Sequence, residues 1–294
     1  MSPRDGLQIE KEWIPTDRKV ELIDALSSSG VHGMQYTSFV PEKWVPQFKD
    51  ADEVAARIRR NPAVKYIGLI PNRKGLERAV KAGVDEISLP AAASEAFARK
   101  NLNRSIGECI DTVAEVVNAA PDGLVVSCAL SVTFGCPYDG LVPVARVVEI
   151  CERLADIGVG VITLADTTGM GNPDLVADIV SRVLQRSAGV PLAVHMHNTR
   201  GAGLANALAA LQEGVDLFDG SVGGLGGCPY APRATGNIAT EDLVNMLHGM
   251  GIQTGVDLDT LVACAELAEK IVGKPLPGQV MRAGVWPPSG RRLG

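Results

Sequence analysis

The stretch VKYIGLIPNRKGLERAVKAGVDEISL, residues 64–89, contains one complete unit of the fold. It begins with an apolar, β-rich run at Val64–Ile70 and continues with Leu76 and Val80 at helical spacing. It ends in a second β-rich run at Val84–Leu89. A strand, a helix and a strand in this order predict two parallel strands joined by a helical crossover.

The same alternation runs from about residue 17 to about residue 250, beginning with a helical stretch at Asp17–Ser28. Seven runs are predicted to be strands: Val31–Tyr36, Val64–Ile70, Val84–Leu89, Leu124–Ala129, Val159–Leu164, Leu192–His197 and Val215–Asp219. Over 294 residues this pattern favours a closed TIM (β/α)₈ barrel over an open doubly wound sheet. We expect the barrel domain to span residues 1–275 and a flexible tail to span residues 276–294.

The first strand of the predicted barrel is truncated or missing. An eight-stranded barrel should begin with an apolar strand just before Arg4, where only Met1, Ser2 and Pro3 stand. A missing strand would leave a barrel edge unpaired, which sheets avoid. We therefore favour a true start of the chain upstream of Met1.

Composition and charge narrow the class of protein. The formal net charge is −6 and Lys and Arg are dispersed, which argues against a nucleic-acid-binding surface. Although 46% of the residues are hydrophobic, no uninterrupted apolar run approaches the ~20 residues of a membrane span. We see no secretion leader. A cytoplasmic protein without a membrane partner is expected.

A cation and an anion stand side by side in Pro3-Arg4-Asp5-Gly6, where the first strand should end. Chemistry in a (β/α)₈ barrel gathers at the C-terminal ends of the strands. A carboxylate at this end can bind a metal, and a guanidinium can stabilise an oxyanion. The alternative is a surface ion pair with a turn glycine, and this stretch taken alone favours it.

Two of the four histidines of the chain, His195 and His197, lie two residues apart at the end of a predicted strand. Side chains two apart on a strand project from the same face, so these imidazoles should point together. Such a pair makes half of a divalent-metal site. Two exposed strand-end histidines are the alternative. His32 and His248 lack this context and are interpreted as structural.

A glycine-rich stretch and an asparagine complete the set of candidate residues. The run Gly223–Gly227, with four glycines, precedes Cys228, which could shuttle a proton from a mobile loop or could be a spacer thiol. Asn237 stands just ahead of a helix expected to begin at Thr240, so its oxygen could reach a cation or only serve a turn. Asp5, two imidazoles and an amide oxygen, without thiolate, favour Mg²⁺ or Mn²⁺ over structural zinc.

Six stretches together resemble the 3-hydroxy-3-methylglutaryl-CoA lyase family. They occur in order along the chain: PRDGLQ (3–8), TSFVPEKWVPQF (37–48), GCPYDG (135–140), HMHNTRG (195–201), GGLGGCPYA (223–231) and TGNIATEDLV (235–244). The last two are the most specific. RDG with HxH alone would also fit related Claisen-condensing synthases, such as isopropylmalate synthase, but these usually lack the cysteine-bearing glycine loop.

The resemblance implies a chemistry for these residues. A divalent cation would be held by Asp5, His195, His197 and Asn237. Arg4 would stabilise an enolate oxygen, and Cys228 would transfer protons from a lid loop. The substrate would be an acyl-CoA, cleaved to acetyl-CoA and a 3-keto acid, acetoacetate for the main substrate of the family. A homodimer is also implied.

Four further residues match positions that bind the substrate or CoA in the family, but this match is less specific. Gln8, Ser38 and Asp166 match substrate-pocket positions, and Lys43 would face the CoA phosphates. For each of them an ordinary loop residue is the alternative.

The chain departs from the family pattern at two positions. The family's active-site glutamate is replaced by Gln35, which keeps hydrogen bonding but cannot accept a proton, and Asn198 stands where HxHD is usual. Because the four inferred ligands, Arg4 and Cys228 are retained, these departures favour an enzyme with a shifted substrate. A condensing acyltransferase of the same superfamily and a non-catalytic CoA- or metal-binding homologue are the alternatives.

Overall fold

A computed structural model describes residues 3–227 and 236–286. Its centre is a seven-stranded parallel sheet whose strands follow one another in sequence order. The strands are β1 (Gly33–Ser38), β2 (Lys65–Leu69), β3 (Glu86–Ala92), β4 (Val125–Ser131), β5 (Val161–Asp166), β6 (Leu192–Met196) and β7 (Leu217–Asp219). Each overlaps the strand predicted for it, so the predicted α/β fold of the TIM-barrel type is confirmed.

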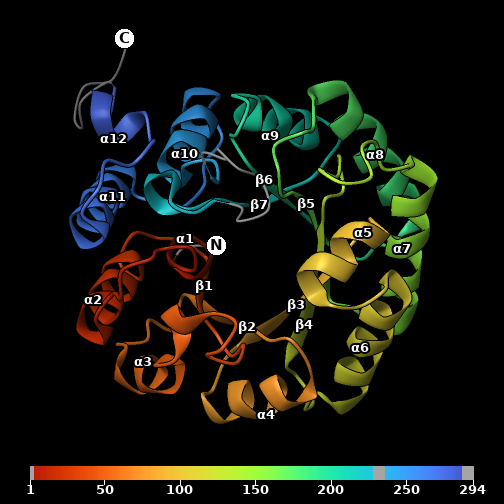
Figure 1. Ribbon diagram of the computed structural model, residues 1–294. Coiled ribbons are helices and arrows are strands. Elements are labelled where there is room, and N and C mark those ends of the chain that lie inside the picture. Colours follow the sequence, from red (N-terminus) through yellow and green to blue (C-terminus); the bar gives the residue numbers. More distant parts are fainter. Residues whose placement is uncertain (1–2, 228–235, 287–294) are drawn as a thin grey trace.

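Helices surround the sheet, as Figure 1 shows in a view along the barrel. The α-helices are α1 (Arg4–Leu7), α2 (Thr16–Leu26), α3 (Ala51–Arg57), α4 (Arg73–Lys81), α5 (Glu95–Phe97), α6 (Ile106–Ala119), α7 (Val144–Ile157), α8 (Pro173–Arg186), α9 (Gly203–Gln212), α10 (Thr240–Gly249), α11 (Leu258–Val272) and α12 (Val280–Ala283). Short turns of other helix types lie at η1 (Pro46–Phe48), η2 (Ala98–Leu102) and η3 (Val222–Gly224). No helix among the described residues is long and apolar enough to cross a membrane.

Local sequence signals explain where the crossover helices begin. Asn72 and Asn172 accept hydrogen bonds from the backbone N–H groups three residues ahead, at the starts of α4 and α8. Ser105 and Glu108 form a reciprocal capping box at the start of α6. These caps fix the residue at which each helix begins after the preceding loop.

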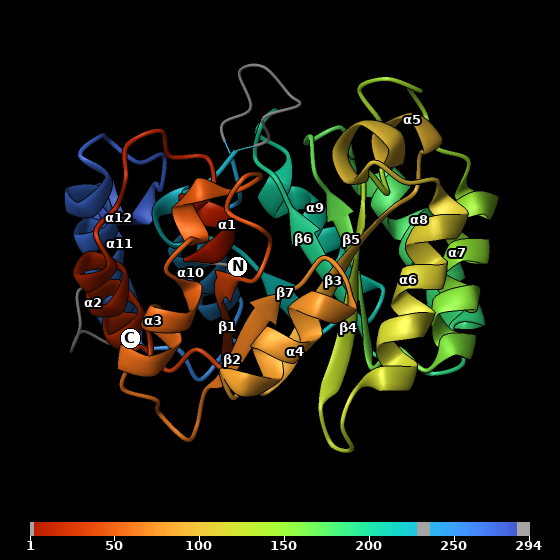
Figure 2. The ribbon, with the colours of Figure 1, turned by 60° about the horizontal axis from the view of Figure 1, so that its bottom comes forward.

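The two edges of the sheet are β1 and β7, which have one neighbouring strand each among the described residues. The segment ahead of β1, where a first barrel strand was expected to end, is instead the one-turn helix α1. The layer of helices is continuous at this point, because α2 and α11, far apart in sequence, lie side by side (Figures 1 and 2).

Part of the expected tail packs against the barrel. Leu276, Val280 and Met281 are buried, and the carboxylate of Asp242 in α10 accepts hydrogen bonds from the backbone of Gln279 and Val280. Residues 276–281 therefore contact the barrel, and the domain boundary expected at residue 275 stays a prediction. The remainder of that tail, residues 287–294, lies outside the described residues.

A buried lysine joins α2 to the loop that follows β1. The Lys19 ammonium lies 2.9 Å from Asp50 Oδ1, donates to the backbone oxygen of Gln47, and sits 3.8 Å above the ring of Trp13. Asp50 also accepts from Thr16 Oγ1 at 2.8 Å. Both charges are almost completely enclosed, so each depends on the other for its hydrogen bonds.

Replacing Asp50 by Ala should lower the free energy of unfolding by about 3 kcal/mol, because it leaves the Lys19 ammonium buried without a carboxylate. Asp52→Ala is the matched control, since Asp52 pairs with Arg78 at the surface and should contribute less than about 1 kcal/mol. Urea unfolding of the two variants measures the difference. Equal losses would mean that the Lys19–Asp50 pair does not stabilise this region.

Candidate metal centre

Helix α1 places Arg4 and Asp5 inside the barrel rather than on the surface. Both side chains are buried, and Arg4 Nη1 donates to Asp5 Oδ1 at 2.7 Å. Gln8, one turn later, donates from Nε2 to Asp5 Oδ1 at 2.8 Å and accepts from Arg4 Nη1 at 3.1 Å. The alternative of a surface ion pair is therefore excluded, and Gln8 holds both charged groups in position.

Gln35 in β1 contacts the same guanidinium. Arg4 Nε donates to Gln35 Oε1, and because a guanidinium has only donors, this contact identifies which end of the amide is the oxygen. The register between β1 and β2 shifts between Gln35 and Thr37, which is a β-bulge beside the site. Bulges of this kind re-aim side chains next to functional centres.

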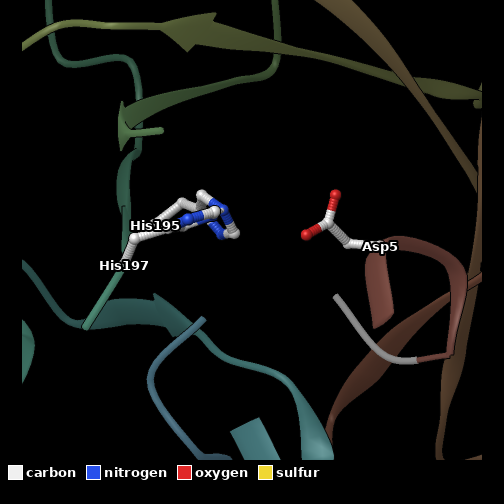
Figure 3. A group of neighbouring side chains, drawn as sticks. All are labelled: Asp5, His195 and His197. Carbon is white, nitrogen blue, oxygen red and sulfur yellow. Dashed lines mark hydrogen bonds between the residues drawn. The ribbon is translucent and has the colours of Figure 1, made fainter. Parts of the chain in front are cut away.

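His195 and His197 face Asp5 across the barrel, as Figure 3 shows. Their ligand atoms and a carboxylate oxygen of Asp5 all lie within 4.8 Å of one another, and all three residues are buried. The two Nε2 atoms are 3.0 Å apart. The expected pairing of the imidazoles is therefore present, although β6 ends at Met196 and His197 follows it.

Asn237 is brought to this cluster by the backbone. His197 and Asn237 form an isolated antiparallel bridge, and Ile238 N donates to Met196 O at 3.0 Å. The Asn237 side chain donates from Nδ2 to Asp5 Oδ2 and to the backbone oxygen of Leu225, both at 2.8 Å. Its Oδ1 is buried and has no hydrogen-bond partner in the described part of the chain.

The glycine-rich stretch packs against both α1 and Asn237. A Cβ added to Gly226, where φ is +111°, would lie 2.5 Å from Asn237 Nδ2 and 3.2 Å from Asp5 O. A Cβ on Gly6 would lie 2.9 Å from Leu225 Cβ. Glycine is therefore required for this close approach. Cys228, which follows, lies outside the described residues.

The residues fit a divalent cation. A buried acceptor such as Asn237 Oδ1 costs free energy unless it finds a partner, and a cation would provide one. Two ligands at adjacent corners of an octahedral ion, about 2.1 Å from it, would lie ~3.0 Å apart, as the two imidazole Nε2 atoms do. Carboxylate, amide and imidazole groups are all ligands of divalent cations in proteins.

Burial and charge set the protonation states of the cluster. Burial alone would raise the pKa of Asp5, but the charge of Arg4, two imidazoles and the hydrogen bond from Asn237 lower it to about 2. Burial and the neighbouring imidazole lower the pKa of His197 to about 4. At neutral pH, Asp5 is therefore an anion and His197 is neutral, the states in which both can bind a cation.

Ser38 and Asp166 also lie at the C-terminal ends of strands, but their oxygen atoms accept backbone hydrogen bonds nearby. Ser38 Oγ accepts from Val40 N at 3.3 Å, and Asp166 accepts from Met170 N and Gly171 N at 2.8 and 3.1 Å. Lys43 lies on the exposed loop after β1, with its ammonium 5.3 Å from the ring of Trp44.

Two acidic residues near the site were missed by the sequence analysis. Asp219, at the end of β7, accepts a hydrogen bond from His195 Nδ1. Glu241, in the first turn of α10, is fully buried and accepts from Gly223 N at 3.1 Å. An acid at the last residue of the strand next to the histidine pair was a usable signal for Asp219. Glu241 has no comparable signal, because acids are common at helix starts.

Comparison with known proteins agrees with this geometry. The sequence model of the family described as HMGL-like matches residues 1–268. The chain belongs to the HMGL-like family. A hydroxymethylglutaryl-CoA lyase of Bacillus subtilis is 44% identical over 280 residues, which cover 95% of this chain and 94% of that protein. The mitochondrial hydroxymethylglutaryl-CoA lyase of mouse is 46% identical over 288 residues, 96% of this chain and 87% of the mouse protein.

The fold of this HMGL-like chain also matches a solved structure. An HMG-CoA lyase from Acinetobacter baumannii, in complex with coenzyme A and 3-methylmalate, superimposes with a TM-score of 0.93 at 42% sequence identity. The match covers 100% of this chain and 96% of that structure.

The stability of the protein should depend on pH through Glu241, whose carboxylate accepts a hydrogen bond from Gly223 in the glycine-rich stretch. Burial raises its pKa to about 7, against about 4.3 in an unfolded chain, so the folded protein binds this proton more tightly. The free energy of unfolding should therefore fall by up to ~3 kcal/mol between pH 4 and pH 7 because of this group. Glu241→Gln should remove that dependence, so that the variant is more stable than the parent at pH 8 and equal to it at pH 4.

Urea unfolding at both pH values measures the effect, with Glu266→Gln, an exposed residue of α11, as the control. Parallel pH curves for the parent and Glu241→Gln would contradict the inferred protonation of Glu241.

Proposed function

We propose that this protein is a divalent-metal-dependent carbon–carbon lyase. Its substrate would be 3-hydroxy-3-methylglutaryl-CoA or a related 3-hydroxyacyl-CoA, and its products acetyl-CoA and a 3-keto acid, acetoacetate for the parent substrate. The observation that carries the proposal is the convergence of Asp5, His195, His197 and Asn237 beside the buried guanidinium of Arg4. The named activity of relatives 44–46% identical supports the reaction.

The cation would be held by Asp5, His195, His197 and Asn237. When bound, it lowers the cost of deprotonating the tertiary hydroxyl of the substrate and polarises an acyl oxygen. The chain fixes the ligands before any substrate arrives, because Asn237 is tied to Asp5 and Gln8 holds Asp5 from the opposite side. Preorganised ligands of this kind need no rearrangement when charge develops.

Arg4 has one donor group free for substrate. Its Nε and Nη1 are occupied by Gln35, Asp5 and Gln8, whereas Nη2 has no hydrogen-bond partner among the described residues. Burial lowers the pKa of Arg4, but the charges of Asp5 and Asp219 oppose this, and a guanidinium stays protonated. Nη2 would donate to the enolate oxygen formed when the carbon–carbon bond breaks.

The remaining roles are carried by residues around this centre. Cys228 would move the proton that the enolate carbon receives, and Gly223–Gly227 bring the chain beside Asp5 just before it. Gln8, Ser38 and Asp166 would shape the acyl pocket, and Lys43 would meet the CoA phosphates. The complex of the Acinetobacter baumannii relative with coenzyme A supports an acyl-CoA ligand.

Purified protein with Mg²⁺ or Mn²⁺ should release acetyl-CoA and acetoacetate from 3-hydroxy-3-methylglutaryl-CoA, and chelation should abolish this activity. Arg4→Met should lower kcat by about 10² to 10³, because it removes the donor to the developing oxyanion. Arg18→Met, at the surface of α2, is the control. Coupled assays of both products measure the effect.

Turnover that survives complete metal removal would refute the metal-dependent mechanism. Formation of a new carbon–carbon bond from acetyl-CoA and a 2-oxo acid, without cleavage, would indicate the condensing transferase instead. Metal binding without turnover of any thioester would indicate the non-catalytic homologue.

Gln35 favours a substrate that differs from the parent compound. Its amide is neutral, it cannot take a proton from the hydroxyl, and its oxygen is already occupied by Arg4. Its Nε2 has no partner among the described residues, so it is available as a donor. An acyl-CoA that presents an acceptor at this point would be preferred.

Gln35→Glu should raise kcat/KM for 3-hydroxy-3-methylglutaryl-CoA by about tenfold, because a carboxylate beside Arg4 can accept a proton. Gln35→Met is the matched control. Its side chain can neither accept a proton nor donate a hydrogen bond, so it should lower kcat/KM. A panel of 3-hydroxy-3-carboxymethyl acyl-CoAs, assayed with both variants, measures the shift in preference. An unchanged ranking of substrates would rule out Gln35 as the cause of specificity.

Two further expectations belong to this proposal. A cytoplasmic location is supported by the mouse relative named as the cytoplasmic lyase, which is 46% identical over 288 residues. The homodimer implied by family resemblance stays a prediction, which sedimentation of the purified chain can test.

A further inference from the structure

Asp219 lies opposite His195 across two neighbouring strands. The two residues are register partners where β7 pairs with β6, and Asp219 Oδ1 contacts His195 Nδ1. The position is fixed by the backbone, because Asp219 is the last residue of β7 and its strand neighbour is the histidine itself. The sheet therefore places a carboxylate behind one of the two imidazoles.

This contact determines which nitrogen of His195 carries the proton. A carboxylate can only accept, so Nδ1 is the nitrogen that donates, and in the neutral ring Nε2 then keeps its lone pair. Nε2 is the atom that lies 3.0 Å from His197 Nε2, and both imidazoles belong to the cluster with Asp5. The ring is thus held in the tautomer and orientation that a metal ligand requires.

The second imidazole has no such support. His197 Nδ1 is buried and has no hydrogen-bond partner in the described part of the chain. The two histidines are therefore unequal: Nδ1 of His195 contacts an anion on an adjacent strand, whereas Nδ1 of His197 has no hydrogen-bond partner among the described residues. The Asp219 side chain is 23% exposed, so water can solvate the rest of its charge.

We propose that Asp219 is a positioning residue of the cation site, acting through His195. It holds the imidazole with Nε2 directed at the ion and makes this nitrogen a stronger ligand than that of His197. The inference rests on the metal site proposed above. The competing interpretation is a plain structural contact that joins β6 to β7.

Binding of Mn²⁺ to the full chain, followed by electron paramagnetic resonance without any acyl-CoA, tests the inference. Asp219→Asn should weaken Mn²⁺ binding by about 10- to 100-fold, because the outer partner of a ligating histidine typically contributes this much. Asp216→Asn makes the same chemical change at an exposed position three residues earlier and should leave the affinity within about twofold. Asp219→Glu should recover part of the loss.

A second measurement separates positioning from a structural role. Nitrogen-15 NMR of the histidine side chains should show His195 of the parent chain as the Nδ1–H tautomer, and Asp219→Asn should change its population. This spectrum of the parent chain decides the matter even if the variants do not fold. An Nε2–H tautomer in the parent, or equal Mn²⁺ affinity in Asp219→Asn and the parent, would overturn the inference.

The outcomes also distinguish this inference from the proposed reaction. Loss of Mn²⁺ affinity in Asp219→Asn, in a protein whose parent cleaves no thioester, would uphold the role of Asp219 and refute the lyase activity. Unchanged Mn²⁺ affinity in Asp219→Asn, in a protein whose parent does cleave the thioester, would refute the role of Asp219 and uphold the lyase activity.

Discussion

The hydrogen bond from Asn237 to Asp5 joins residues 232 positions apart, and the site depends on it. It brings the first helical turn of the chain and the segment before α10 to the same point, beside the histidines of β6. Nδ2 of Asn237 donates to Asp5 and Leu225, and its Oδ1 has no partner within residues 3–227 and 236–286. A cation bound between Asp5 and the two imidazoles would give this buried amide oxygen a partner.

The repeating pattern of the fold could be predicted because its signals are local. Each predicted strand overlaps an observed one, and the spacing of His195 and His197 was enough to predict that they meet. The one-turn helix at Arg4 was not predicted, since a strand was expected to end there. Four residues contain too little periodicity to indicate a helix, and their conformation depends on packing against the glycine stretch.

Residues that act through strand pairing were harder to find. Asp219 lies within a predicted strand, but its role follows from its register opposite His195, which the sequence does not state. The bulge at Gln35 is similar, because it appears only when β1 is aligned with β2. Ligand types can be inferred from residue types, whereas the residues that orient those ligands are defined by tertiary contacts.

The segment after α11 has a consequence for the glycine stretch. Leu276 packs against Gly223, Gly278 lies against the carboxylate of Glu241, and Gly278 N donates to Gly223 O at 3.1 Å. The glycine-rich stretch Gly223–Gly227 therefore packs against α1 on one side and against the C-terminal segment on the other. A different C-terminal segment would thus shift the glycine-rich stretch beside Asp5 and Asn237 while Asp5, His195, His197 and Asn237 themselves stay unchanged.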